Sequence, residues 1–354
     1  MDPDAFAKLI CDWCLEVRER QYVLVSTTPL AAPLIRSFHR ALIERGAWSP
    51  GLRIELPGLT EDFYRLASEE LLDGFPAADL AEWEHVDATL NIQAPENTRA
   101  LAGVDPGLIT RVARARNPIR EARLSKRWCL TMWPTSALAQ DAGISDDAYA
   151  AFLGRALFLD RPDPVAAWRE LSERQQRVVD RLNSAREIRI EAEGTDLRLR
   201  VEGRTWMNSD GRRNMPSGEV FTGPIEDSAS GTIRFTVPSN PRGVLVEDVT
   251  LTFENGEVRR ATAQRGQQYL DAALATDPGA RFLGELGIGT NSGIDRPTGS
   301  ILLDEKMAGT VHLALGRSYP ETGGRNQSAL HWDLICDLRP GGRLTADGEA
   351  ISIE

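Results

Sequence analysis

The sequence has few cysteines, no long apolar run and fewer positive than negative charges, and each shortage argues against a class of protein. Four cysteines in 354 residues are too few for a scaffold held together by disulfides. No apolar stretch approaches the ~20 residues that a membrane-spanning helix needs, and no cationic, apolar leader stands at the amino terminus. We therefore expect a cytoplasmic protein with no membrane anchor.

Positive charge is also scarce. The 41 Lys and Arg are outnumbered by 52 Asp and Glu, which gives a formal net charge of −11 and a pI near 5.1. A nucleic-acid-binding face needs clustered Lys and Arg to displace counterions, so nucleic acid is not an expected partner. Hydrophobic residues make up 42% of the chain, which is enough for a large core and, at this length, for two domains.

Two of the cysteines, Cys11 and Cys14, form a C-x-x-C sequence near the amino terminus. The surrounding segment, residues 6–17, has the apolar spacing of an amphipathic helix. Free cysteine is among the most buried residue types, so core packing is expected for both residues in preference to a redox or metal role.

The first half of the chain alternates short apolar strands with longer amphipathic stretches, which predicts an open, doubly wound α/β sheet. No strand-to-helix turn in this region carries a G-x-G-x-x-G or a Walker lysine, so no nucleotide site is expected. The predicted strands cover 22–26, 52–56, 86–92 and 128–133, and the predicted helices cover 32–45, 61–72 and 108–123.

A mostly helical connector, residues 145–182, precedes a change of pattern. After Arg186 the chain shows period-two strands and glycine turns, with Asn255-Gly256 as a strong hairpin signal. We therefore predict an N-terminal α/β domain with its helical connector over residues 1–185. It is followed by a β-rich α+β domain, expected to bind metal and carry out catalysis, over residues 186–354.

The second of these predicted domains collects carboxylates and imidazoles in apolar surroundings. Buried charges cost several kcal/mol each unless they are paired or bound to metal, so a divalent-metal hydrolase is expected. His331 and Asp333 form a plausible chelate, because residues i and i+2 of a strand point to the same face. The potential ligands are Glu219, Glu285, Glu305, His312, His331 and Asp333.

Five motifs occur in a fixed order along this region: NMPSGEVFTGPIEDS, GELGIGTN, DEKMAGTVHLALG, SYP and HWD. Together they resemble the motifs of the aminopeptidase T (aminopeptidase S) family of metallopeptidases. The resemblance is specific from about residue 186 onward. It implies a two-domain, usually dimeric exopeptidase that removes amino-terminal residues from peptides. It also implies a centre of two divalent ions, with zinc or cobalt expected and manganese or magnesium possible.

The same resemblance suggests roles for individual residues. It implies that Glu285 bridges the two ions, that Tyr319 lies against them, and that Glu305 is a further candidate ligand. Glu305 stands seven residues before His312, where better-known members of the family have a glutamate five residues before, so its place in the site is left open. The other ligands implied by the motifs are Glu219, His312, His331 and Asp333.

A carboxylate that is not a ligand is also needed to carry a proton to the leaving amine. Glu226 and Asp227, in the segment PIEDS, are the candidates, and Glu226 is the predicted catalytic residue. The alternative is that both residues support the turn after Pro224. Lys306 could pair with a carboxylate near the metals, although a solvated lysine is the commoner outcome.

Other functions remain open from the sequence. His312, His331 and Asp333 could form the two-histidine, one-carboxylate triad of a mononuclear non-haem iron enzyme, such as a ring-cleaving dioxygenase. Such an enzyme has no need of Glu219 and Glu285. A narrow-specificity metal-dependent amidase or dipeptidase would use the same ligands, and a non-catalytic binding protein would be expected to have lost some of them.

Overall fold

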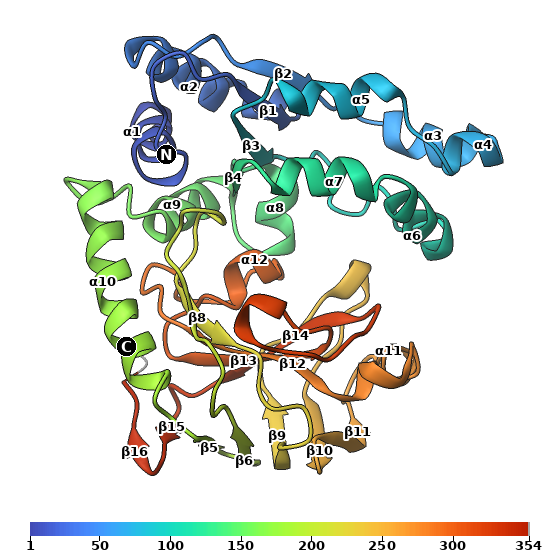
Figure 1. Cartoon of the computed structure of the whole chain (residues 1–354), viewed down its shortest axis with the longest axis vertical. Helices are drawn as coiled ribbons and strands as arrows, with labels where there is room; N and C mark the ends of the chain where they lie inside the picture. Colours follow the sequence, from blue (N-terminus) through green and yellow to red (C-terminus); the bar gives the residue numbers. More distant parts are fainter. Residues whose placement is uncertain (353–354) are drawn as a thin grey trace. The chain divides into compact units, whose positions relative to one another are not determined.

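The computed structural model describes residues 1–352, with only the backbone of Arg242, and it forms two compact units (Figure 1). The first unit contains Met1–Val165 and Gly211–Met215, and the second contains Ala166–Asp210 and the chain from Pro216 onward. The predicted boundary at residue 186 therefore falls inside the second unit. The assignment of catalysis to the second domain remains a prediction, because compactness does not show which unit performs chemistry.

The first unit is built around a parallel sheet with the strand order β2-β1-β3-β4. The order reverses at β1, as in doubly wound folds, and the predicted α/β class is confirmed. Its strands are β1 (Val23–Thr27), β2 (Gly51–Ile54), β3 (Ala88–Gln93) and β4 (Arg127–Met132). Its helices include α1 (Pro3–Leu9), α2 (Ala32–Glu44), α5 (Ala77–Ala81), α8 (Ser136–Asp141) and α9 (Asp146–Ala156).

Two of the predicted helices are each broken into two, so the prediction of continuous helices was wrong there. The helix predicted over 61–72 consists of α3 (Leu59–Leu66) and α4 (Glu69–Leu72), because Ala67 is extended and Ser68 caps a new helix. The helix predicted over 108–123 consists of α6 (Pro106–Ala115) and α7 (Asn117–Leu124). Pro118, near the start of α7, has no N–H to continue the first helix.

The amino-terminal segment also differs from a single helix. Helix α1 continues into a π-helical turn over Ile10–Cys14, and Glu16 adopts a positive φ of 44° just after it. Cys11 and Cys14 are both buried within this turn, which confirms the expected core packing.

A short segment of the chain returns from the second unit to the first. The backbone N–H of Met215 donates to the carbonyl of Leu130 at 2.8 Å, and the N–H of Leu130 donates to the carbonyl of Arg213 at 2.8 Å. Residues 211–215 therefore run beside β4, forming a parallel bridge between Leu130 and Asn214. The NMPSGE motif thus begins in the first unit and ends in the second.

The second unit contains two sheets. The seven-stranded sheet has the order β11-β10-β9-β6-β5-β15-β16, and the five-stranded sheet has the order β14-β13-β12-β8-β7. The first comprises β5 (Glu187–Ala192), β6 (Thr195–Arg200), β9 (Ser230–Phe235), β10 (Val249–Glu254), β11 (Glu257–Thr262), β15 (Arg343–Ala346) and β16 (Glu349–Ala350). The second comprises β7 (Met207–Ser209), β8 (Glu219–Thr222), β12 (Leu283–Gly289), β13 (Thr310–Gly316) and β14 (His331–Asp337). Helices α10 (Pro164–Leu182), α11 (Gln267–Leu274) and α12 (Ile301–Asp304) accompany them.

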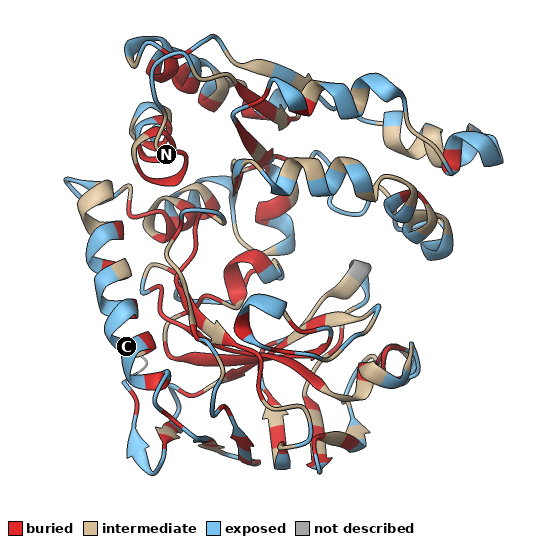
Figure 2. Cartoon of the chain, in the orientation of Figure 1, coloured by how far each residue is buried: buried red, intermediate tan, exposed pale blue. Residues whose placement is uncertain are grey.

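The two sheets share one apolar core, so each contributes its alternate residues to it. Ile188 and Ile190 of β5 belong to the same buried cluster as Leu286 of β12 and Leu313 of β13. Strands β12 and β13 are buried along their whole length (Figure 2). The other face of the five-stranded sheet is therefore free to carry polar side chains.

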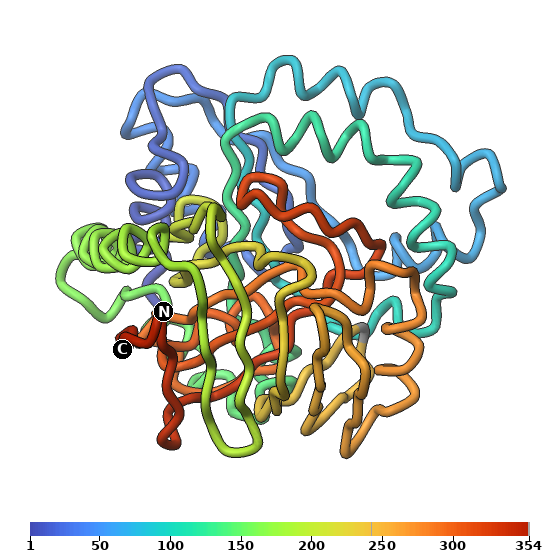
Figure 3. The backbone as a smooth tube through the Cα atoms, turned by 60° about the horizontal axis from the view of Figure 1, so that its bottom comes forward, coloured from blue at the N-terminus to red at the C-terminus, as the bar shows by residue number. Residues whose placement is uncertain are grey.

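The turns follow the glycine pattern of the sequence. Asn255 and Gly256 have φ values of 51° and 80° and join β10 to β11 in an antiparallel hairpin, as predicted. The β5–β6 hairpin is the yellow-green loop at the lower edge of Figure 3. Among the helices within residues 1–352, none combines the length and the apolar character that crossing a membrane requires.

Candidate metal centre

Four neighbouring strands of the five-stranded sheet carry five of the six candidate ligands. Glu219 is the first residue of β8, Glu285 lies in β12, His312 in β13, and His331 and Asp333 in β14. Because these strands are adjacent in the order β14-β13-β12-β8, residues far apart in the sequence become neighbours. Their flanking residues Val220, Leu286, Leu313 and Trp332 belong to the apolar core, so the ligands occupy the opposite face.

Small residues beside the ligands make room for them. Gly287 pairs directly with His312 across β12 and β13, and a Cβ atom at Gly287 would lie 2.0 Å from Nε2 of that histidine. Ala314 pairs with Glu285 on one side and with Asp333 on the other. The GELG and HLALG motifs therefore supply both ligands and the small residues, Gly287 and Ala314, that leave room for the ligand side chains.

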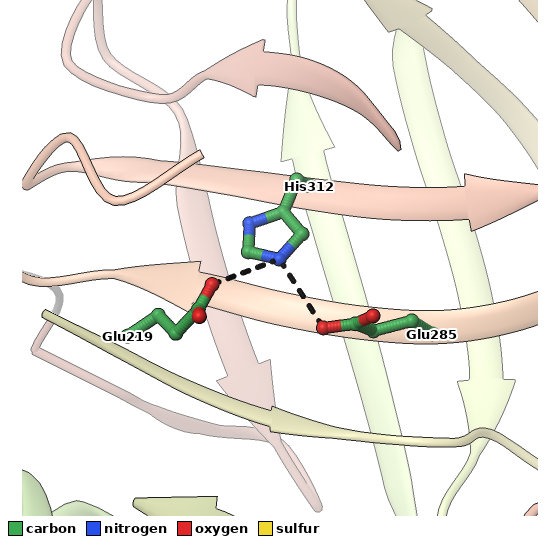
Figure 4. A group of neighbouring side chains, drawn as sticks. All are labelled: Glu219, Glu285 and His312. Atoms are coloured by element: carbon green, nitrogen blue, oxygen red, sulfur yellow. Dashed lines mark ion pairs between the residues drawn. The ribbon is translucent and has the colours of Figure 1, made fainter. Parts of the chain in front are cut away.

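His312 lies between two carboxylates, as Figure 4 shows. Its Nε2 atom is 3.4 Å from Oε2 of Glu219 and 3.5 Å from Oε1 of Glu285. A tetrahedral site with metal–ligand bonds of ~2.0 to 2.1 Å has ligand–ligand edges of about 3.3 to 3.4 Å. Both distances from His312 are close to such an edge, and one ligand atom from each of the three residues lies within 4.8 Å of the others.

Glu285 presents its two oxygens to two different histidines. Oε1 faces His312, whereas Oε2 is 3.5 Å from Nε2 of His331, which in turn lies 3.5 Å from Oδ2 of Asp333. One carboxylate therefore belongs to two groups of potential ligands: Glu219, Glu285 and His312, and Glu285, His331 and Asp333. This is the arrangement expected of a bridging ligand.

Several polar atoms of this cluster make no hydrogen bond within the described part of the chain. These atoms are both ring nitrogens of the fully buried His312 and Oδ1 of Asp333. Such orphaned buried groups are costly unless something else binds them. Imidazole and carboxylate donors together suit a metal such as zinc, so these residues fit a divalent metal.

The electrostatics of the cluster agree with this fit. Burial raises the pKa of Asp333 to about 7, and it also raises the pKa of Glu219. Burial by itself lowers the pKa of His312, but Glu285 and Glu219 outweigh it and raise that pKa to about 9. Without a cation the cluster would retain protons near neutral pH, and binding of a metal would release them.

Glu305 lies beside the other candidate ligands, a position that the sequence analysis left open. It follows α12 and forms a third group with His312 and Asp333. Its neighbour Lys306 is fully buried and pairs with both Glu305 and Glu219. Lys306 is therefore not solvated, as a lysine more commonly is, because the buried Glu219 and the half-buried Glu305 hold its ammonium in place.

Tyr319 also lies at the cluster. Its hydroxyl oxygen is 3.4 Å from Nε2 of His331, and its ring packs edge-on against His331 and Phe221. Burial raises the pKa of Tyr319, so its phenol stays protonated and can donate a hydrogen bond.

Glu226 has a different environment and belongs to none of the three ligand groups found among the described residues. Its Oε1 accepts the backbone N–H of Arg325 at 2.7 Å, and its Oε2 accepts from the guanidinium of Arg204 at 2.6 Å. Only 8% of the Arg204 side chain is exposed. Both carboxylate oxygens therefore have structural partners.

We expect Glu226→Gln to lower stability more than turnover. The substitution weakens a partly buried ion pair, for which a loss of ~1 to 3 kcal/mol in the free energy of unfolding is typical, while kcat should stay within a few-fold of wild type. Thermal unfolding and steady-state kinetics on one preparation test this. A large loss of kcat in a protein of unchanged stability would instead support the predicted catalytic role of Glu226.

Some residues that shape the centre were not singled out from the sequence. Gly287 and Ala314 are small residues on strands, and only their cross-strand register shows that each faces a ligand. The alternation of glycine with apolar residues in GELGIG was a usable signal, because glycine within a strand often marks close approach of another group.

Comparisons with known proteins agree with the geometry. A family model described as thermophilic metalloprotease (M29) matches residues 2–353. Aminopeptidase 2 of Geobacillus stearothermophilus is 32% identical, over 98% of this chain and 94% of the relative. Aminopeptidase T of Thermus thermophilus is 30% identical, over 76% of each chain.

A solved structure shows the same fold. The structure of wild-type AmpT from Thermus thermophilus superposes with a TM-score of 0.85 at 25% identity, covering 99% of this chain and 96% of the other. These matches confirm the resemblance predicted from the motifs and do not favour the dioxygenase alternative. The chain therefore belongs to the thermophilic metalloprotease family (M29), the family of the metallo-aminopeptidases T and S.

Proposed function

We propose that this enzyme is an aminopeptidase that hydrolyses the N-terminal peptide bond of peptides with a water activated by two divalent ions. One observation carries the proposal: six buried or half-buried ligand side chains, five of them on strands of one sheet, form three overlapping groups. Glu285, His312 and Asp333 each belong to two of the groups. A set of shared ligands suits two neighbouring ions better than one.

The proposed ligands are Glu219, Glu285, Glu305, His312, His331 and Asp333, with Glu285 as the bridge. When bound, two ions would supply an activated water, a polarised scissile carbonyl and an anchor for the free amino group. We propose zinc or cobalt as the physiological metal, because imidazole and carboxylate donors suit both; manganese or magnesium would fit the carboxylates alone. The metal content of protein purified without chelators tests this identity.

The residues of the chain would assist in distinct ways. Tyr319, with a protonated hydroxyl beside His331, is placed to donate a hydrogen bond to an oxygen that gains negative charge during the reaction. The sequence predicted that Glu226 moves the proton to the leaving amine, and the Glu226→Gln experiment described above decides that role.

Space for a substrate side chain adjoins the proposed ligands. A cavity of about 260 Å³ includes His331 and Asp333 in its wall. Its apolar wall contains Pro238, Ile301 and Ile335. A hydrophobic wall next to a polar centre is typical of ligand pockets, which supports a peptide as the substrate.

Metal removal tests the proposed activity. Protein stripped with a chelator should release no free amino acid from short peptides, and zinc or cobalt should restore release at least about a hundredfold, because the ligands alone cannot activate water. N-acetylated versions of the same peptides serve as controls and should stay intact. Cleavage of acetylated peptides at a comparable rate would contradict an aminopeptidase, and metal-independent cleavage would contradict the proposed centre.

Three further properties are proposed from the sequence and the family. A homodimer would show twice the 39.0 kDa of one chain in light scattering at micromolar concentration. A cytoplasmic location fits four free, buried cysteines and is tested by cell fractionation. Catalysis by the domain predicted over residues 186–354 fits the position of all six proposed ligands in the second unit, and metal bound elsewhere would contradict it.

A further inference from the structure

Lys306 contacts the ligand cluster from one side. Its side chain is 0% exposed, its Nζ lies 3.2 Å from Oε1 of Glu219, and it also pairs with Oε1 of Glu305. The ion pairs of Glu285 and Asp333 within residues 1–352 go instead to His312 and His331. Among the described residues, the ammonium therefore pairs with one carboxylate of the group Glu219, Glu285 and His312 and with Glu305 of the third group, but with no carboxylate of the group Glu285, His331 and Asp333.

The two oxygens of Glu219 have different partners. Oε1 faces the ammonium of Lys306, and Oε2 faces Nε2 of His312 at 3.4 Å. A carboxylate held in this way can offer a single oxygen to an ion. The group formed by Glu219, Glu285 and His312 thus shares one of its carboxylates with a fixed positive charge, whereas the group formed by Glu285, His331 and Asp333 does not.

The net charge of the cluster also affects how strongly a second ion would bind. The four carboxylates of the proposed set carry four negative charges when ionised, which two divalent ions would balance, so the ammonium is one positive charge in excess. After a first ion has bound, a second ion meets one net negative charge with Lys306 present and two without it. Coulomb interactions at such short range are strong when the groups are buried.

We infer that Lys306 makes the two proposed ion positions unequal, weakening the position held by Glu219, Glu285 and His312 relative to the one held by Glu285, His331 and Asp333. This inference rests on the two-ion centre proposed above. Lys306 is in this sense a positioning residue: it holds Glu219 and Glu305 in place before metal binds and keeps one ion exchangeable. Occupation of both ion positions, and therefore activity, would then depend on the concentration of free metal.

Equilibrium dialysis of stripped protein against buffered zinc, with bound metal counted by mass spectrometry, tests the inference directly. Wild type should bind two ions with dissociation constants at least tenfold apart. Lys306→Met, which keeps an unbranched side chain one atom shorter and removes its charge, should tighten the weaker constant at least tenfold and bring the two closer. Lys8→Met, at an exposed lysine of the first helix, is the matched control and should bind like wild type.

A second pair of variants identifies the positions without altering Lys306, so the test survives if Lys306→Met does not fold. Glu219→Gln should lose the weaker ion and keep the tighter one, and Asp333→Asn should lose the tighter one. The reverse assignment would overturn the inference. Unchanged zinc constants in a folded Lys306→Met protein, or two equal constants in wild type, would overturn it as well while leaving a two-ion centre intact. Binding of one ion or none by wild type would instead refute the two-ion proposal itself.

Discussion

Glu285→Gln is expected to remove bound metal from both positions and to lower peptidase activity at least about a thousandfold, equivalent to ~4 kcal/mol of transition-state stabilisation. The two oxygens of Glu285 face His312 and His331 at 3.5 Å each, so this side chain belongs both to the group with Glu219 and His312 and to the group with His331 and Asp333. Glutamine has nearly the same shape, but it carries no charge and replaces one oxygen ligand with an amide nitrogen. Metal content after dialysis and kcat on a short peptide measure the two effects.

Glu254→Gln is a suitable control for this variant. Glu254 is an exposed residue of β10 in the same unit, and the substitution makes the same change of charge away from the ligands. It should leave metal content and kcat at the wild-type level. If Glu285→Gln retained two ions, or turned over substrate within tenfold of wild type, Glu285 would not be the bridging ligand.

Gly287→Ala is expected to disrupt the centre although it adds one methyl group and changes no ligand. The added Cβ would lie 2.0 Å from Nε2 and 2.1 Å from Cε1 of His312, so the imidazole must move away from Glu219 and Glu285. Overpacking of a buried site costs ~1 to 3 kcal/mol, and activity should fall at least about a hundredfold as His312 leaves its position. Thermal unfolding, metal content and kinetics report the three consequences.

Gly154→Ala gives a matched comparison. Gly154 lies in α9 and needs no positive φ, and a Cβ atom there would meet nothing within 4 Å beyond the backbone of its own helix. Alanine is favoured over glycine in helices by ~1 kcal/mol, so this variant should keep full activity and gain slightly in stability. Equal behaviour of the two alanine variants would show that the close packing of Gly287 on His312 has no functional role.

Much of the fold was predictable because its signals are local. The alternation of apolar strands with amphipathic stretches gives the parallel sheet of the first unit, and Asn255-Gly256 gives the β10–β11 hairpin. The helix breaks at Ala67 and Arg116 were missed, since a cap at Ser68 and a proline at position 118 compete with an otherwise continuous helical pattern.

The candidate ligands could be named from motifs, but their spatial grouping could not. Which residues share an ion depends on strand order and register, such as the pairing of Ala314 with both Glu285 and Asp333. The burial of Lys306 was likewise hidden, because a lysine after two acidic residues is usually solvated. Only the convergence of Glu219 and Glu305 on its ammonium explains why it lies inside the protein.

The return of residues 211–215 to the first unit limits how this protein can be taken apart. A fragment ending at residue 165 or 185 would leave the carbonyl and N–H of Leu130 without their partners at Met215 and Arg213, exposing a strand edge that invites aggregation. A fragment starting after residue 165 or 185 would carry 211–215 with nothing to pair with, four residues before Glu219. The second unit, which contains all six proposed ligands, therefore cannot be moved into another scaffold as an independent module, and a chimaera of this chain must exchange both units together or rebuild residues 211–215.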